Sequence, residues 1–273
     1  MTEFSPGHGP DSASSAELPA GFPPGFQVQP ALPTTPPAPS DPRFPPAERA
    51  LADQLAQQRQ ADPLAGVKVG AGLFYDQLLQ TLQGDPRGVR AELLLGVPAL
   101  LAGYACQAAT WESLVIGMGY PVDSVFILAG TAQGVHYPFS DPMNHLLLED
   151  PYSVWGLVSA AARAKTDQPL PDAADTVAYV VRSIGTPAFG RPRLPEGYTL
   201  GEDAIKLLEA AWPRFLPLLG LCCALPEEWP ALFAVALQRS METVRQLIDP
   251  VTACAIAIEC AVPMAHLPMR QVA

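Results

Sequence analysis

Hydrophobic residues recur at a helical period along most of the chain after residue 46. The clearest stripe is formed by Phe233, Leu237, Met241, Val244 and Ile248, whose spacings are four, four, three and four residues. Residues at these spacings lie on one face of a helix, and such a face packs into a core. The pattern therefore predicts a mainly α fold. The predicted helices lie near 47–60, 71–83, 86–117, 141–149, 151–165, 172–184, 202–221, 227–248 and 250–262.

Two of these helices carry further expectations. The helix over 86–117 contains Pro98, which lacks the amide hydrogen that a helix interior uses, so we expect a bend or a break there. The helix over 250–262 continues the apolar stripe of the helix before it. We therefore expect the last two helices to pack as an antiparallel hairpin.

Asp-Pro pairs mark several of the predicted helix starts. An Asp at the N-cap accepts free amide hydrogens of the first turn, and a Pro that follows it has no amide hydrogen to leave unpaired. The pairs that begin at Asp85, Asp141, Asp150 and Asp249 each precede an apolar periodic run. Neighbouring carboxylates at these places, such as Glu149 and Asp150, are interpreted as helix-start residues and not as paired catalytic acids.

One stretch departs from the helical period. Residues 124–129 are rich in β-branched and aromatic side chains, residues 130–134 read Gly-Thr-Ala-Gln-Gly, and residues 135–139 read Val-His-Tyr-Pro-Phe. Two short apolar runs around a glycine-containing turn predict a β-hairpin. Because Pro138 has no amide hydrogen to donate, the second strand is expected at a sheet edge.

The N-terminal 46 residues differ in composition from the rest. They contain thirteen prolines and only five charged residues. Such a segment cannot bury a core, so we predict a disordered, proline-rich arm over 1–46 and a single helical domain over 47–273. Several PxxP spacings, such as Pro30/Pro33 and Pro36/Pro39, suggest a docking site for a protein partner. A passive extension is the alternative.

The charge balance narrows the choice of partners. The chain holds 27 acidic and 16 basic residues, a net charge of −11. An acidic field repels phosphate backbones and anionic lipids, so we expect neither nucleic acid nor a membrane as a partner. The longest apolar run, 93–109, is also shorter than the roughly 20 residues that a membrane span needs.

Other sequence features suggest where the protein is located. The N-terminus has neither the basic nor the apolar region of a secretory signal, and the five cysteines sit mostly in apolar runs, as reduced thiols do. We therefore expect a cytoplasmic protein. The excess of thirteen arginines over three lysines, with abundant Ala and Pro, suggests a bacterial origin.

Three residues near the predicted hairpin resemble metal ligands. His136, Asp141 and His145 offer two imidazoles and a carboxylate, which suit zinc or ferrous iron. Their spacing matches no established motif, and Asp141 is already expected to cap a helix. We therefore expect no metal and no cofactor, and keep this trio as the candidate set for one.

Cys106 is the candidate nucleophile. It lies late in a long apolar helix, where the dipole disfavours a thiolate, and no histidine is near it in sequence. A buried structural cysteine is the favoured interpretation, and a thiol hydrolase is the alternative.

Four aromatic residues are candidates for a ligand pocket. Tyr137 and Phe139 lie on the predicted hairpin, while Tyr152 and Trp155 are three residues apart on the helix over 151–165. Aromatic residues also dominate helical cores, so a core role is the first interpretation. If a pocket exists, we expect it between the hairpin and this helix.

These patterns bound the function without fixing it, and whether the protein is an enzyme stays open. The sequence favours a non-enzymatic interaction or adaptor protein that uses its arm. One alternative is a metal-dependent or small-molecule enzyme with a site near the hairpin over 124–139. Another is a secreted bacterial effector that is exported without a cleaved signal.

Overall fold

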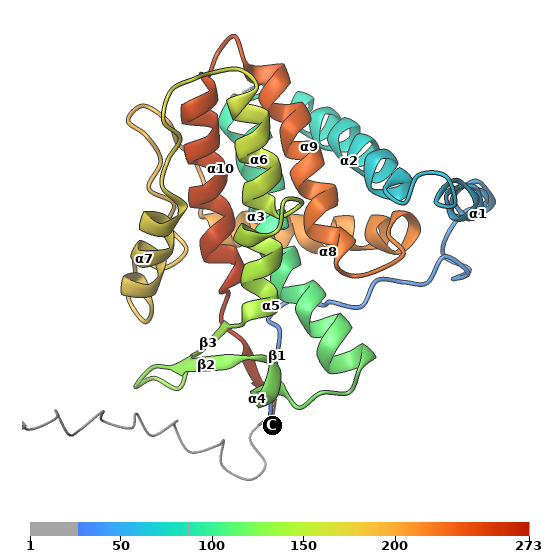
Figure 1. Cartoon of the computed structure of the whole chain (residues 1–273), viewed down its shortest axis with the longest axis horizontal. Coiled ribbons are helices and arrows are strands. Elements are labelled where there is room, and N and C mark those ends of the chain that lie inside the picture. Colours follow the sequence, from blue (N-terminus) through green and yellow to red (C-terminus); the bar gives the residue numbers. More distant parts are fainter. Residues whose placement is uncertain (1–26, 87, 273) are drawn as a thin grey trace, which may run out of the picture.

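Helix α3 (Ala91–Thr110) runs through the centre of the molecule, with the other long helices around it (Figure 1). The structure is a computed structural model, and it describes residues 27–86 and 88–272. Every α3 residue from Leu93 to Thr110 is buried. The helix is so closely surrounded that a Cβ atom at Gly103 would overlap the carbonyl oxygen of Ala261 on α10 (Pro250–Ala265).

The expected mainly α architecture with a small β-hairpin is confirmed. The remaining helices are α1 (Pro46–Gln58), α2 (Ala65–Gln83), α4 (Val122–Val125), α5 (Asp141–Asn144), α6 (Val154–Arg163), α7 (Ala173–Ser183), α8 (Ala204–Cys222) and α9 (Glu228–Val244). Two π-helical segments, η1 (Trp111–Gly117) and η2 (His145–Glu149), extend α3 and α5. The strands are β1 (Gln27–Gln29), β2 (Ile127–Gly130), β3 (His136–Phe139) and β4 (Arg270–Val272).

The long central helix is continuous through Pro98. Helix α3 is not broken there but continues from Ala91 to Thr110, and the helical geometry changes only at Trp111, where η1 begins. Close packing on all sides holds the helix together across the missing hydrogen bond. Among the described residues, the segment Ala91–Gly117 is the one helix long and apolar enough to cross a membrane, and its apolar window is wholly buried in the domain.

Helices α9 and α10 do not form the expected antiparallel hairpin. Both pack along α3 and against α6, which lies between them, and they contact each other only slightly (Figure 1). The apolar face of α9 points to other partners, since the ring of Phe233 lies 5.1 Å from that of Phe74 and 6.2 Å from that of Trp212. The stripe was correctly interpreted as core, but it is completed by α2, α3 and α8.

The proline-rich segment is held against the domain over its described part. Strand β1 pairs antiparallel with β4, joining the two ends of the described chain. The Tyr104 hydroxyl donates to the Leu32 carbonyl (2.9 Å) and accepts from its amide (3.2 Å), and Trp212 Nε1 donates to the carbonyl of Pro33 (2.6 Å). The boundary at residue 46 thus marks the first helix, whereas packing begins at β1. Residues 1–26 of the predicted arm lie outside the described residues.

The hairpin forms in the expected place. Strands β2 and β3 pair antiparallel, with Ile127 opposite Phe139 and Gly130 opposite His136. Gly134 adopts a φ of 74°, which suits the turn between them. On its other side β3 meets the segment before β4, where the Met269 amide donates to the His136 carbonyl (2.8 Å). The hairpin is therefore fixed to the chain end as well as to the helices.

Only one of the four Asp-Pro predictions describes a true cap. Asp249 caps α10 by accepting from the amides of Val251 and Thr252 at 3.0 Å. Helix α6 begins later than expected, at a Ser153 cap, while α3 begins after Arg90 and α5 after Ser140. Of the other three, Asp141 lies in the first turn of α5, where a carboxylate is favourable to the helix dipole, whereas Asp85 and Asp150 follow the ends of α2 and η2.

Candidate functional site

The three candidate metal ligands are not brought together. His136 lies half-buried in β3, and Asp141 is exposed in the first turn of α5. His145 is exposed in η2, with its Nε2 3.3 Å from Asp150 Oδ2. Within residues 27–86 and 88–272, no group of three or more His, Cys, Asp and Glu side chains is placed to hold a metal ion. His145 therefore contacts a neighbouring acid and not a shared site.

Cys106 lies fully buried near the C-terminal end of α3. Its thiol donates to the carbonyl of Ala102, 3.3 Å away, and burial raises its pKa well above the usual value. A nucleophilic cysteine needs the opposite shift and access to solvent. The position of Cys106 fits the structural role that the sequence favoured.

The four candidate aromatic residues face different neighbours. The Tyr137 ring packs edge-on against Phe189 at 4.7 Å, and the Phe139 ring lies 4.5 Å from His266. Trp155 packs toward α10, whereas Tyr152 is 63% exposed. Tyr137 and Phe139 thus fix the hairpin to the domain, whereas Tyr152 and Trp155 have different neighbours.

Glu259 and Arg193 form a hydrogen-bonded ionic cluster that the sequence did not indicate. Glu259 of α10, only 7% exposed, accepts from Thr176 Oγ1 (2.8 Å) and from the backbone amide of Arg193 (2.9 Å). The Arg193 guanidinium also binds it, through Nε at 3.1 Å and Nη2 at 2.5 Å. Arg193 further pairs with Asp175 (3.0 Å) and lies over the ring of Tyr179. We call these residues the Glu259 clamp.

The Glu259 clamp fastens the loop before α8 to α7 and α10. Glu259 raises the pKa of the Arg193 guanidinium, as expected for a cation held by a carboxylate. A hollow of about 520 Å³ lies beside it. Because Glu259 is buried and both its oxygens are already bound by Thr176 and Arg193, the clamp is better suited to holding the loop than to binding a ligand.

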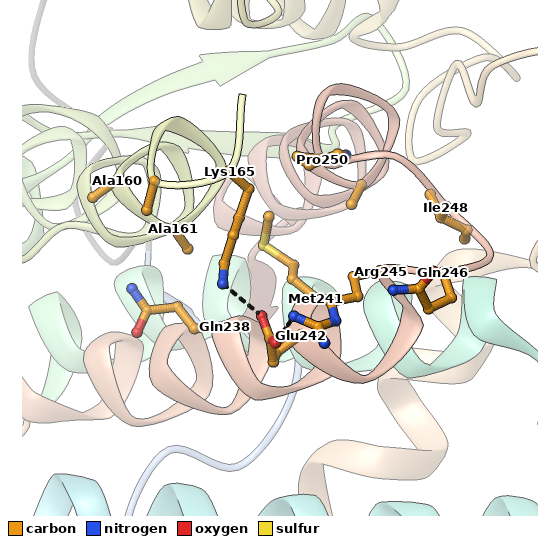
Figure 2. A pocket seen from close by; sticks show the side chains of 12 residues that line it. Ala160, Ala161, Lys165, Gln238, Met241, Glu242, Arg245, Gln246, Ile248 and Pro250 are labelled. Atoms are coloured by element: carbon orange, nitrogen blue, oxygen red, sulfur yellow. Dashed lines mark ion pairs between the residues drawn. The ribbon is translucent and has the colours of Figure 1, made fainter. Parts of the chain in front are cut away.

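A larger cleft opens where α6 and α9 end and α10 begins. It has a volume of about 590 Å³. Its apolar lining residues are Ala160, Ala161, Ala164, Met241, Ile248, Pro250 and Ala253, and its polar ones are Lys165, Gln238, Glu242, Arg245 and Gln246 (Figure 2). We call this space the α6/α9/α10 cleft.

Local sequence explains the shape of the cleft. Helix α6 presents alanines here, whose short side chains leave space beside α9. Met241 and Ile248, both nearly buried, belong to the apolar stripe of α9 and the turn after it, and form the opposite wall. Gln238 joins the two walls, since its Nε2 donates to the Leu157 carbonyl (2.7 Å). Asp249 starts α10 at the remaining side.

Three charged side chains meet at the rim of the α6/α9/α10 cleft. Figure 2 shows Lys165 reaching from the α6 side to Glu242 on α9. Lys165 Nζ lies 3.2 Å from one carboxylate oxygen of Glu242, and Arg245 Nη1 lies 2.7 Å from the other. All three side chains are about half exposed, at 48%, 50% and 53% for Lys165, Glu242 and Arg245. We call them the rim triad.

The sequence held only a faint signal for this cleft. Met241 and Ile248 were assigned to the core, which is correct as far as their burial goes. What the periodicity does not show is that the alanine-rich end of α6 faces that stripe.

No protein-family model matches the chain, and neither a curated protein nor a solved structure matches it.

Proposed function

We propose that the protein is a non-enzymatic binding protein that takes a small, largely apolar organic ligand in the α6/α9/α10 cleft. The observation that carries this proposal is the cleft itself. Its volume of about 590 Å³ falls in the range of about 300–1,000 Å³ that is usual for ligand sites. Apolar walls with a few polar groups at one side are also typical of such sites.

In this function the ligand binds in the α6/α9/α10 cleft, and the proline-rich arm is not the binding site. The described part of the arm, residues 27–45, already binds within the chain, through Tyr104 and Trp212. A partner that reads the PxxP spacings around Pro33 and Pro36 would have to detach this segment first. The cleft, by contrast, is open to a ligand without any such rearrangement.

A titration with octan-1-ol tests the proposal. This probe has an apolar chain and no charge, so its binding reports on the walls of the cleft alone. We expect saturable one-to-one binding by isothermal titration calorimetry. Ala161→Phe, which fills the cleft from α6, should abolish it, and Ala164→Phe should do the same from a second position.

The matched control is Ala210→Phe, the same substitution at an exposed alanine of α8. It should leave binding unchanged. Circular dichroism and the midpoint of urea unfolding establish that each variant is folded. Equal octan-1-ol binding in wild type, Ala161→Phe and Ala164→Phe would place the ligand elsewhere and contradict the proposal.

A further inference from the structure

The rim triad holds a carboxylate between two cations at the mouth of an apolar cleft. From this geometry we infer that the ligand of the α6/α9/α10 cleft is an amphipathic carboxylic acid, with its chain in the cleft and its carboxylate at Lys165 and Arg245. The inference rests on the proposed function and names the chemical class of its ligand.

Charge complementarity is the first argument. The cleft lining contains two cations and one carboxylate, a net charge of +1, in a chain whose net charge is −11. A ligand with one negative charge would make the site neutral. A cationic ligand would instead face Lys165 and Arg245, with Glu242 already shared between them.

The position of Glu242 is the second argument. Its two oxygens bind Lys165 and Arg245 separately, so the rim already accommodates one carboxylate that bridges the two helices. Hydrogen bonds between ionised partners are among the strongest that side chains make. Both cations therefore lie within reach of one carboxylate at the rim, and a ligand carboxylate there would compete with Glu242 for them.

Placement of the apolar chain follows from the walls. If the ligand's carboxylate lies at the rim, its alkyl chain contacts Ala161 on α6 and Met241 and Ile248 on the α9 side. Each buried methylene of the ligand's alkyl chain should tighten binding by about fourfold. The walls therefore supply affinity, while the rim distinguishes an acid from a neutral molecule of the same length.

Octanoate and octan-1-ol form a matched pair of probes, because they differ only in the polar end. At neutral pH and low salt we expect octanoate to bind about tenfold more tightly than octan-1-ol, because its carboxylate gains two half-exposed ion pairs that contribute about threefold each. Lys165→Gln and Arg245→Gln should each weaken octanoate about threefold and leave octan-1-ol unchanged.

Glu242→Gln provides the sharpest test. It removes the negative charge that competes for both cations, so octanoate should bind several-fold more tightly while octan-1-ol does not change. Lys206→Gln, at an exposed lysine of α8, is the control and should alter neither. Nonspecific binding of an apolar chain would not respond to Glu242→Gln in this direction.

The possible outcomes separate this inference from the proposed function. If octan-1-ol and octanoate bind the cleft equally, or if Glu242→Gln weakens octanoate, the carboxylic acid is wrong and the binding cleft stands. If neither probe binds, or if Ala161→Phe and Ala164→Phe leave both unaffected, the proposed function and the inference fail together.

Discussion

The Glu259 clamp and the rim triad use the same chemistry to different ends. Each joins a glutamate to basic side chains across two elements of the fold. In the clamp the carboxylate is 7% exposed and both its oxygens have several partners, whereas the Glu242 side chain is 50% exposed and binds two cations. We infer from this contrast that the buried cluster stabilises the fold, whereas the exposed one is accessible to a ligand.

The physical reason lies in solvation. A buried carboxylate that loses its cation is left uncompensated away from water, and such losses cost several kcal/mol. An exposed carboxylate is rehydrated at once, so the same loss changes stability little. We therefore expect the ion pairs at the rim to contribute little to folding, which would leave Lys165 and Arg245 able to exchange Glu242 for a bound anion.

Removing the cation of the clamp should have the largest effect on stability. We expect Arg193→Met to lower the free energy of unfolding by about 3 kcal/mol, because Glu259 then keeps only neutral donors in a buried place. Arg193 is itself 35% exposed, which puts the loss at the lower end of that for buried pairs. Urea unfolding followed by tryptophan fluorescence measures it.

The double variant Arg193→Met/Glu259→Met completes this test. Since it removes the buried charge together with its partner, it should recover most of the loss. A double variant less stable than Arg193→Met would show that the clamp contributes through packing and not through charge.

A buried histidine extends the comparison to pH. His266 is buried, its Nδ1 lies 2.9 Å from the Pro138 carbonyl, and burial lowers its pKa below 6.5. Between the folded pKa and pH 6.5 the unfolded chain binds a proton at His266 that the folded chain does not bind. The free energy of unfolding is therefore unaffected by this group above pH 6.5 and decreases as the pH falls toward the folded pKa. The slope is at most about 1.4 kcal/mol per pH unit.

His266→Gln should flatten this slope between pH 6.5 and 5. Carboxylates such as Asp249, whose pKa is lowered from 3.8, affect stability only at lower pH. Equal slopes in wild type and His266→Gln, measured by urea unfolding at several pH values, would contradict the role assigned to burial.

The sequence predicted the parts of this fold that have a local cause. The stripe from Phe233 to Ile248 follows from helical periodicity, and the hairpin over 124–139 from β-branched runs around a glycine turn. It did not predict the pairing of Gln27–Gln29 with Arg270–Val272, since two three-residue strands in distant segments carry no pattern of their own.

The candidate sites were less predictable for a related reason. His136, Asp141 and His145 are close in sequence, and closeness in sequence made them a candidate set. The groups that do meet, such as Arg193 with Glu259 or Lys165 with Glu242, are separated by many residues. They join only because α7 packs on α10 and α6 packs on α9. Such pairs depend on tertiary packing.

Salt should affect the two clusters differently. Screening at 0.15 M salt acts over about 8 Å and reaches exposed charges far more than buried ones. We expect octanoate binding at the rim to weaken by about two- to threefold between 0.02 M and 0.3 M sodium chloride. The stability difference between wild type and Arg193→Met should stay constant over the same range. An octanoate binding constant that does not change with salt would show that Lys165 and Arg245 do not contribute to its recognition.

The smallest expected effect is the contribution of the rim triad to folding. Lys165→Met, Glu242→Gln and their double variant form a cycle whose coupling free energy should be below about 0.5 kcal/mol, as for other exposed pairs. Urea unfolding of all four proteins measures it. A coupling of 2 kcal/mol or more would make the rim triad a second structural clamp, and Glu242 would then hold its cations too firmly to share them with a ligand. A small coupling, together with tighter octanoate binding by Glu242→Gln, would leave ligand binding as the role of these three charges.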